Sequence, residues 1–209
     1  MMQIRKNLDY FTSPHFLDFD GGAGVLRSRG GTRMVAVNED WLRGFVGALE
    51  HEAGSATPAI LQRCGEFFGD RLAQRFDSEL SGFAGVPLRD RTMNEFCTLL
   101  DDLWVGCGMG KLEIDWSRAA QFLPLRLLHS PMQDIGPSGH VGDDLFAGIL
   151  LGFFSRLADQ KLQVFQTGDE RLGDREGTTF ILGPQSVIDR AKSFKEEGHR
   201  HSEIVERLS

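Results

Sequence analysis

The first half of the chain changes from an alternating pattern of apolar and polar residues to a helical one. Residues 25–28 and 33–37 alternate on either side of Gly30-Gly31, which predicts a β-hairpin. Beyond the hairpin, apolar residues recur every three or four positions, the spacing of an amphipathic helix. This spacing predicts helices over residues 40–53, 58–76 and 92–104.

The second half of the chain predicts a sheet built around one strongly apolar helix. Residues 145–158 are apolar on nearly every side, as in a helix that is buried all round. Asp143 and Asp144 precede this helix, and acidic side chains suit the positive end of a helix. Short strand-like segments flank the helix on both sides. They comprise residues 111–116, 122–129, 162–166 and 178–182.

This order of elements predicts an α+β fold. We expect an antiparallel sheet packed against helices, an N-terminal β-hairpin followed by helices, and one central buried helix. A chain of 209 residues suits a single domain of this kind. Its parts would be an irregular arm over residues 1–24, the α+β domain over residues 25–184 and a charged helix over residues 185–209.

Composition and charge argue against two classes of partner. Lys and Arg number 23 and Asp and Glu number 30, a net charge of −7, whereas nucleic-acid binding needs clustered positive charge. The longest apolar run, residues 145–154, is about half of the ~20 residues that a membrane span needs. The first residues carry no apolar stretch of the kind that a secretory leader has. We therefore expect a soluble, cytoplasmic protein with no nucleic-acid partner and no membrane insertion.

No residue pattern in the chain is typical of an active site. Cys64, Cys97 and Cys107 lack the paired spacing of a zinc ribbon, and no serine lies in a Gly-x-Ser-x-Gly turn. The glycine-rich loop at residues 106–110 follows a helix, whereas a dinucleotide-binding loop precedes one. The carboxylates lie at helix starts and on charged faces, where no acid–base pair can be identified. We expect a protein that is not an enzyme and has no cofactor.

An interior rich in aromatic residues leaves small-molecule binding as the function to consider. An apolar pocket with one or two polar groups is the usual site for a small ligand. His129, at the end of a predicted strand, could supply such a polar group or could simply bond to the backbone. The apolar side chains could equally be ordinary core. The candidate ligand-binding residues are Trp104, Phe122, Leu127, His129, Leu150, Phe153, Phe154 and Phe165. We expect the central helix, with Leu150, Phe153 and Phe154, to pack over the strands that carry Phe122, Leu127, His129 and Phe165.

Three stretches of the chain resemble the vinyl-4-reductase family of hydrocarbon-binding domains. They are residues 24–35 together with Gly65-x-x-x-Gly69, residues 125–130, and residues 151–184 with their Gly-Phe and closing Gly-Pro pairs. The same domain forms the N-terminal sensor of phenol- and toluene-responsive activators. The resemblance implies a non-catalytic, stand-alone module that binds an apolar or aromatic small molecule.

The resemblance also implies where a metal would be held. Sensor members of the family hold zinc with three cysteines and a carboxylate. The matching positions here are Ala147, Gln166, Asp169 and Thr178. None of them supplies a thiolate, so we expect no structural zinc in this chain.

A second resemblance gives an alternative function. Residues 93–104, 108–113 and 125–129 are similar to the cellulose synthase operon protein D family, whose members are oligomeric scaffolds of bacterial cellulose synthesis. A scaffold protein would act by assembling, whereas for the binding module we expect a homodimer. The dimer contacts would come from helices 40–53 and 58–76, which carry more large apolar residues than one buried face needs.

Overall fold

A computed structural model of the chain describes residues 10–133, 135, 142–169 and 177–209, so residues 1–9 of the predicted arm lie outside it. The chain divides into two compact units. The described residues up to 38, together with residues 74–109, form one of them, which we call the arm unit. Residues 39–73 and the described residues from 110 onward form the other, which we call the sheet unit.

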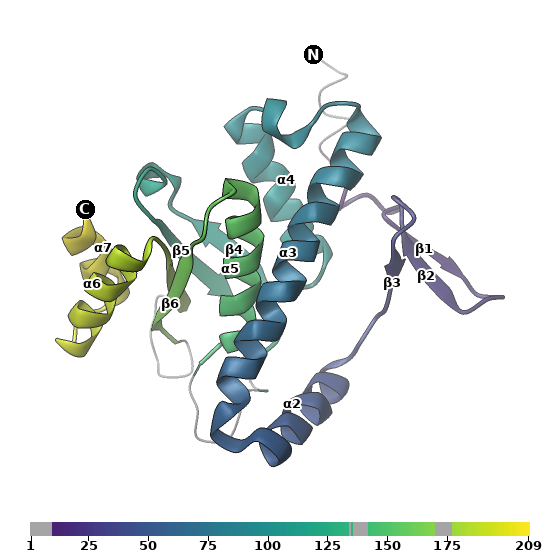
Figure 1. Cartoon of the computed structure of the whole chain (residues 1–209). Coiled ribbons are helices and arrows are strands. Elements are labelled where there is room, and N and C mark those ends of the chain that lie inside the picture. The colour runs from purple at the N-terminus through teal and green to yellow at the C-terminus, as the bar shows by residue number, and fades with distance from the viewer. Residues whose placement is uncertain (1–9, 134, 136–141, 170–176) are drawn as a thin grey trace. The chain divides into compact units, whose positions relative to one another are not determined.

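The sheet unit is built on a four-stranded antiparallel sheet (Figure 1). The strand order is β4-β5-β7-β6, so β5 and β7 are the inner strands. The strands are β4 (Lys111–Ile114), β5 (Leu123–Leu128), β6 (Gln163–Gly168) and β7 (Thr178–Gly183). The 3-10 turn η3 (Trp116–Arg118) joins β4 to β5. Every strand pair is antiparallel, as the sequence predicts.

Strand register decides which side chains share a face of this sheet. Leu125 of β5 lies opposite Phe180 of β7. The next residue, Ile181, packs in a buried cluster with helices α6 (Gln185–Glu196) and α7 (His201–Leu208). Because side chains alternate along a strand, Leu125 and Phe180 point away from α6 and α7. We call the α6–α7 side the outer face and the opposite side the inner face.

Helix α5 (Asp144–Ala158) covers the inner face. The backbone N–H of Asp143, directly before α5, donates to Oε1 of Gln166 over 2.8 Å. Gln166 lies opposite Phe180 in the β6–β7 register, so its side chain belongs to the inner face. The nine residues from Phe146 to Phe154 are all buried, which confirms the prediction of a central buried helix.

Helix α3 (Thr57–Ala84) touches α5 backbone to backbone. A Cβ built on Gly152 of α5 would lie 2.0 Å from the carbonyl oxygen of Glu66 on α3. Real Cβ atoms do not approach an oxygen so closely, so only glycine fits there. Equivalent close approaches occur at all four positions of the crossing. These are Gly65 and Gly69 on α3, and Gly148 and Gly152 on α5.

Helix α2 (Glu39–Ala53) and the 3-10 turn η1 (Gly54–Ala56) lead into α3. Val46 is buried, whereas Trp41 and Phe45 are 56% and 39% exposed. The two exposed rings stack on each other with their centroids 5.6 Å apart. The apolar residues of this helix therefore lie on two sides of it, one buried and one exposed.

The arm unit combines a small sheet with helices. Its sheet is antiparallel in the order β1-β2-β3. The strands are β1 (Leu17–Asp20), β2 (Val25–Ser28) and β3 (Arg33–Met34). The end of α3 from residue 74 onward, the 3-10 turn η2 (Leu88–Asp90) and helix α4 (Met93–Gly106) complete the unit.

One buried carboxylate fastens the small sheet to the end of α3. The side chain of Glu79 accepts hydrogen bonds from the hydroxyls of Tyr10 (3.1 Å), Ser28 (2.9 Å) and Thr32 (2.7 Å). Nε of Arg75, one turn earlier on α3, lies 4.0 Å from the same carboxylate. Hydrogen bonds and a nearby cation offset the cost of burying this charge. Glu79 therefore joins Tyr10 and the β2–β3 hairpin to α3.

The arm and the tail are more ordered than the sequence predicts. Residues 17–20 of the predicted irregular arm form β1, because they pair with β2. The tail contains two helices in place of one, since the chain turns at Gly198, where φ is 90°. Helix α3 continues to Ala84, beyond its predicted end at residue 76. The predicted α+β fold class, with an N-terminal hairpin followed by helices, is confirmed.

Gly152→Ala should destabilise the protein strongly. The added methyl group would lie 2.0 Å from the carbonyl oxygen of Glu66, so α3 and α5 would have to separate. Overpacking of this kind costs about 1–3 kcal/mol, and a clash with rigid backbone favours the upper end. Thermal unfolding followed by circular dichroism measures the loss.

Gly47→Ala is the matched control for this change. A Cβ on Gly47 in α2 meets nothing within 4 Å, and alanine is the better helix former. We expect the control to melt at or above the wild-type temperature. Equal melting temperatures for the two variants would contradict the close crossing of α3 and α5.

Tyr10 should ionise at an unusually high pH. Burial, and after it the negative charge of Glu79, raises the pKa of Tyr10 to about 12. The folded state therefore favours the neutral phenol, whose contribution to stability is complete below pH 10.0 and is lost as the pH rises through about 12. Tyr10 is the one tyrosine of the chain, so tyrosinate absorbance after a rapid pH jump reports it alone.

Glu79→Gln should move this midpoint part of the way back. It removes the negative charge but leaves the burial, which is the larger cause of the raised pKa of Tyr10. A wild-type midpoint near the ordinary value of 10.0 would show that the phenol is not buried against Glu79.

Candidate functional site

Three of the predicted ligand-binding residues are buried on the two elements that bound the layer between α5 and the sheet. Leu127 is two residues after Leu125 on β5 and therefore points to the inner face. Leu150 and Phe153 belong to α5, which covers that face, and all three candidate side chains are 0% exposed. The structure thus buries these candidates within the sheet unit, on β5 and on α5.

Phe154 lies at the edge of this layer. Its ring meets that of Phe153 edge to face with centroids 5.3 Å apart, and that of Trp116 with centroids 6.2 Å apart. Aromatic pairs in this geometry add stabilisation beyond the area that they bury. Trp116 therefore contacts a candidate residue, although it is not one of the eight candidates itself.

Two other candidates lie on the opposite face of the sheet. Phe122 belongs to the buried cluster formed with α6 and α7, and Phe165 packs against the same cluster. The expectation that they face α5 is therefore wrong. The physical reason is the alternation of side chains along a strand, because it separates Phe165 from Gln166 and places them on different faces.

His129 does not point into the apolar layer. It follows β5 directly, it is exposed, and its φ of 57° lies in the left-handed region. The turn carries the chain away from the strand, and the next residue, Ser130, is the buried one. The inner face does contain a polar group at this end of β5: Thr178, 4% exposed, lies opposite Leu127.

Trp104 belongs to the arm unit. It lies in the last part of α4, it is 0% exposed, and its carbonyl oxygen accepts a hydrogen bond from the backbone N–H of Met109. Trp104 is therefore not on the sheet or on α5. Whether any of the eight candidates binds a ligand stays a prediction.

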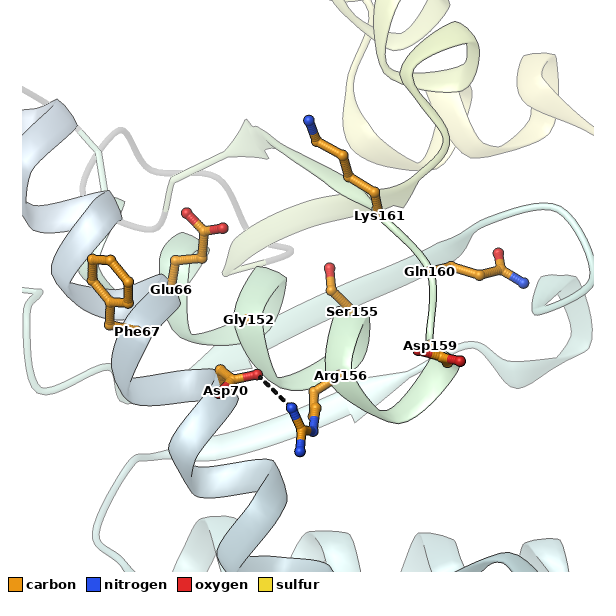
Figure 2. Close-up of a pocket in the computed structure, with 9 residues that line it drawn as sticks. All are labelled: Glu66, Phe67, Asp70, Gly152, Ser155, Arg156, Asp159, Gln160 and Lys161. Carbon is orange, nitrogen blue, oxygen red and sulfur yellow. Dashed lines mark ion pairs between the residues drawn. The ribbon is translucent and has the colours of Figure 1, made fainter.

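A pocket of about 490 Å³ lies beside the glycine crossing of α3 and α5 (Figure 2). Gly152 contributes bare backbone to its wall, and the other lining residues come from α3, from α5 and from the residues that follow α5. None of the predicted ligand-binding residues lines it. The lining residues are Glu66, Phe67, Asp70, Gly152, Ser155, Arg156, Asp159, Gln160 and Lys161.

The charges of this pocket are largely paired with each other or with neighbours. Nη1 of Arg156 lies 3.6 Å from Oδ1 of Asp70, and this pair is drawn as a dashed line in Figure 2. Nη1 of Arg63, outside the pocket, lies 2.7 Å from Oε2 of Glu66. These pairs are partly exposed, so each stabilises the fold weakly. The pocket is lined mainly by charged and polar side chains, whereas Leu127, Leu150 and Phe153 are apolar and fully buried.

The residues at the expected zinc positions do not fit a zinc ion. Structural zinc prefers thiolate and imidazole ligands, and Ala147, Gln166, Asp169 and Thr178 supply neither. The side-chain N–H of Gln166 instead donates to Oδ2 of Asp169 over 2.8 Å. Among the residues that the structure describes, no group of three or more His, Cys, Asp or Glu side chains could hold a metal ion.

The cysteines offer no alternative ligand set or activated nucleophile. In the structure all three are free thiols, and Cys64 is exposed. Burial raises the pKa of the Cys97 and Cys107 thiols, which keeps them protonated near neutral pH.

Solved structures with this fold are known. The crystal structure of the phenol-responsive sensory domain of the transcription activator PoxR, with phenol, matches with a TM-score of 0.64 and 18% identity. The match covers 88% of this chain and 90% of that one. The chain has the fold of that sensory domain. This finding confirms the resemblance to the activator sensors at the level of the fold.

A second solved structure is less similar to this chain, and the sequence comparisons found no match. A vinyl-4-reductase family protein from Methanocaldococcus jannaschii matches with a TM-score of 0.45 and 17% identity, over 71% of this chain and 82% of that one. No family model and no curated protein sequence matches the chain. Neither structure supports the cellulose-synthesis alternative. No helix within the described ranges is long and apolar enough to span a membrane.

Proposed function

We propose that this chain is a non-catalytic module that binds an apolar or aromatic small molecule in the layer between α5 and the inner face of the sheet. The observation that carries the proposal is the fold shared with a phenol-responsive sensory domain over 88% of this chain. We also propose that the module is cytoplasmic, because its three cysteines are free thiols, as suits a reducing compartment. A ligand of this chemistry would be recognised by shape and by few polar contacts.

The residues of the inner face suit such a ligand. Leu127, Leu150 and Phe153 offer apolar surface that is out of contact with water. Thr178, opposite Leu127, offers a hydroxyl at the edge of the same surface. A phenol ring placed there would gain apolar contact from the leucines and a hydrogen bond from the threonine. We therefore propose that Thr178 supplies the polar group of the site, in place of His129.

Small aromatic molecules should raise the melting temperature of the protein. A ligand that binds only the folded state stabilises it by mass action, by about 2.7 kcal/mol at a concentration one hundred times its Kd. Differential scanning fluorimetry with phenol and toluene measures this shift. Leu127→Trp should fill the layer and abolish the shift while the far-ultraviolet circular dichroism stays unchanged.

Two further variants test the site within the same assay. Val187→Trp adds the same indole on α6, at the outer-face cluster, and should leave the shift intact. Thr178→Val should weaken phenol about tenfold, because it removes one hydrogen bond, and should leave toluene unaffected. If neither aromatic stabilises the wild type, or if Leu127→Trp responds as the wild type does, the proposed site is wrong.

We further propose that the module is a homodimer joined through α2 and the first part of α3. Large apolar side chains on these helices face outward: Trp41 (56% exposed), Phe45 (39%), Phe67 (63%) and Phe68 (48%). Exposed aromatic groups of this kind are typical of interfaces. A second copy of the chain offers the same surface, as the isologous contact of a two-fold dimer requires.

Sedimentation velocity tests the dimer directly. The wild type should sediment as a dimer at micromolar concentration, and Phe68→Lys should sediment as a monomer with an unchanged melting curve. Val105→Lys replaces a residue of α4 that is 52% exposed and should remain dimeric. A monomeric wild type would contradict the proposal.

A further inference from the structure

A series of buried and half-buried hydrogen bonds runs through the sheet unit where the first residues of α5 meet the ends of two strands. The Ser130 hydroxyl, just beyond β5, donates to the carboxylate of Asp143. The backbone N–H of Asp143 donates to Oε1 of Gln166 on β6 over 2.8 Å. Nε2 of Gln166 donates to Oδ2 of Asp169 over 2.8 Å and to the carbonyl oxygen of Gly168 over 3.2 Å.

Gln166 is the central residue of this series of hydrogen bonds. Its amide oxygen accepts one hydrogen bond and its amide nitrogen donates two, so both of its polar atoms are used. Asp143 and Asp169 are each 3% exposed. Buried polar atoms that lose such partners are costly, and a fully bonded network is correspondingly rigid.

The hydrogen bonds join two places where regular secondary structure begins or is interrupted. Asp143 is the N-cap of α5, and its carboxylate also accepts from the backbone N–H of Phe146. At the other end, the β6–β7 register shifts between Gln166 and Gly168, so the regular ladder is interrupted there. The amide of Gln166 is hydrogen-bonded both to Asp143 and to the residues after the register shift, so it holds the start of α5 against the end of β6.

We propose that the Gln166 amide is the brace between the start of α5 and the end of β6, at positions where the resemblance to the activator sensors implies a zinc site that the residues present here do not fit. The donor set favours this assignment, because one amide and one carboxylate form a complementary pair and supply no soft ligand for zinc. The brace is a property of the fold and is independent of the proposed ligand.

Hydrogen exchange followed by mass spectrometry on the full chain tests the brace. Gln166→Met keeps the volume of the side chain and removes its three hydrogen bonds. Amides at the start of α5, residues 144–147, should exchange about tenfold faster in this variant. Gln163→Met is the control, because residue 163 is on the same strand opposite Gly183, on the outer face. It should leave those amides unchanged.

The metal alternative is measured on the same samples. Elemental analysis should find no stoichiometric zinc, and EDTA should change neither exchange nor melting. If Gln166→Met does not fold, Asp169→Ala removes one bond of the brace and should produce a smaller acceleration at the same amides. Unchanged exchange in both variants, one zinc per chain, or faster exchange in EDTA would each overturn the proposal.

Discussion

The backbone contact between α3 and α5 is the constraint on which the sheet unit depends. At the four glycines, carbonyl oxygens of one helix lie where the other helix would carry a Cβ. Such close approach permits dispersion and Cα–H···O contacts between backbones that larger residues would prevent. Helix α5 is therefore held between α3 and the inner face, with its residues from Phe146 to Phe154 buried. The apolar layer proposed to bind a ligand follows from this packing.

Two polar side chains complement the apolar packing, one in each unit. Glu79 accepts hydrogen bonds from the hydroxyls of Tyr10 and of the β2–β3 hairpin, and Gln166 links the start of α5 to β6. Each is placed where regular secondary structure alone gives few contacts: a small sheet in one case and a strand irregularity in the other. Satisfied buried polar groups of this kind specify one arrangement among several apolar alternatives. The molecule thus combines a buried apolar layer with a few polar side chains that make directional hydrogen bonds.

Hydrophobic spacing predicts most of the elements, because burial on one side of a helix or strand leaves a period in the sequence. The almost fully apolar segment that forms α5 is the clearest example. The same spacing cannot say which face of the sheet a strand residue occupies, since that depends on register. The expectation that Phe165 faces α5 is wrong for this reason. It also cannot anticipate a positive φ at a histidine, which turns His129 to the surface. Gln166 resembles an ordinary strand residue in the sequence because its role depends on partners distant in the chain.

Methyl-selective NMR of the chain during a phenol titration tests the central claim most directly. The two faces of one sheet provide an internal comparison, with Leu127 and Leu150 associated with the inner face and Ile188 and Ile204 in the outer-face cluster. The account predicts saturable shifts and phenol nuclear Overhauser effects at the Leu127 and Leu150 methyl groups, and none at Ile188 and Ile204. Effects confined to the outer-face methyls, or to the exposed surface, would contradict it.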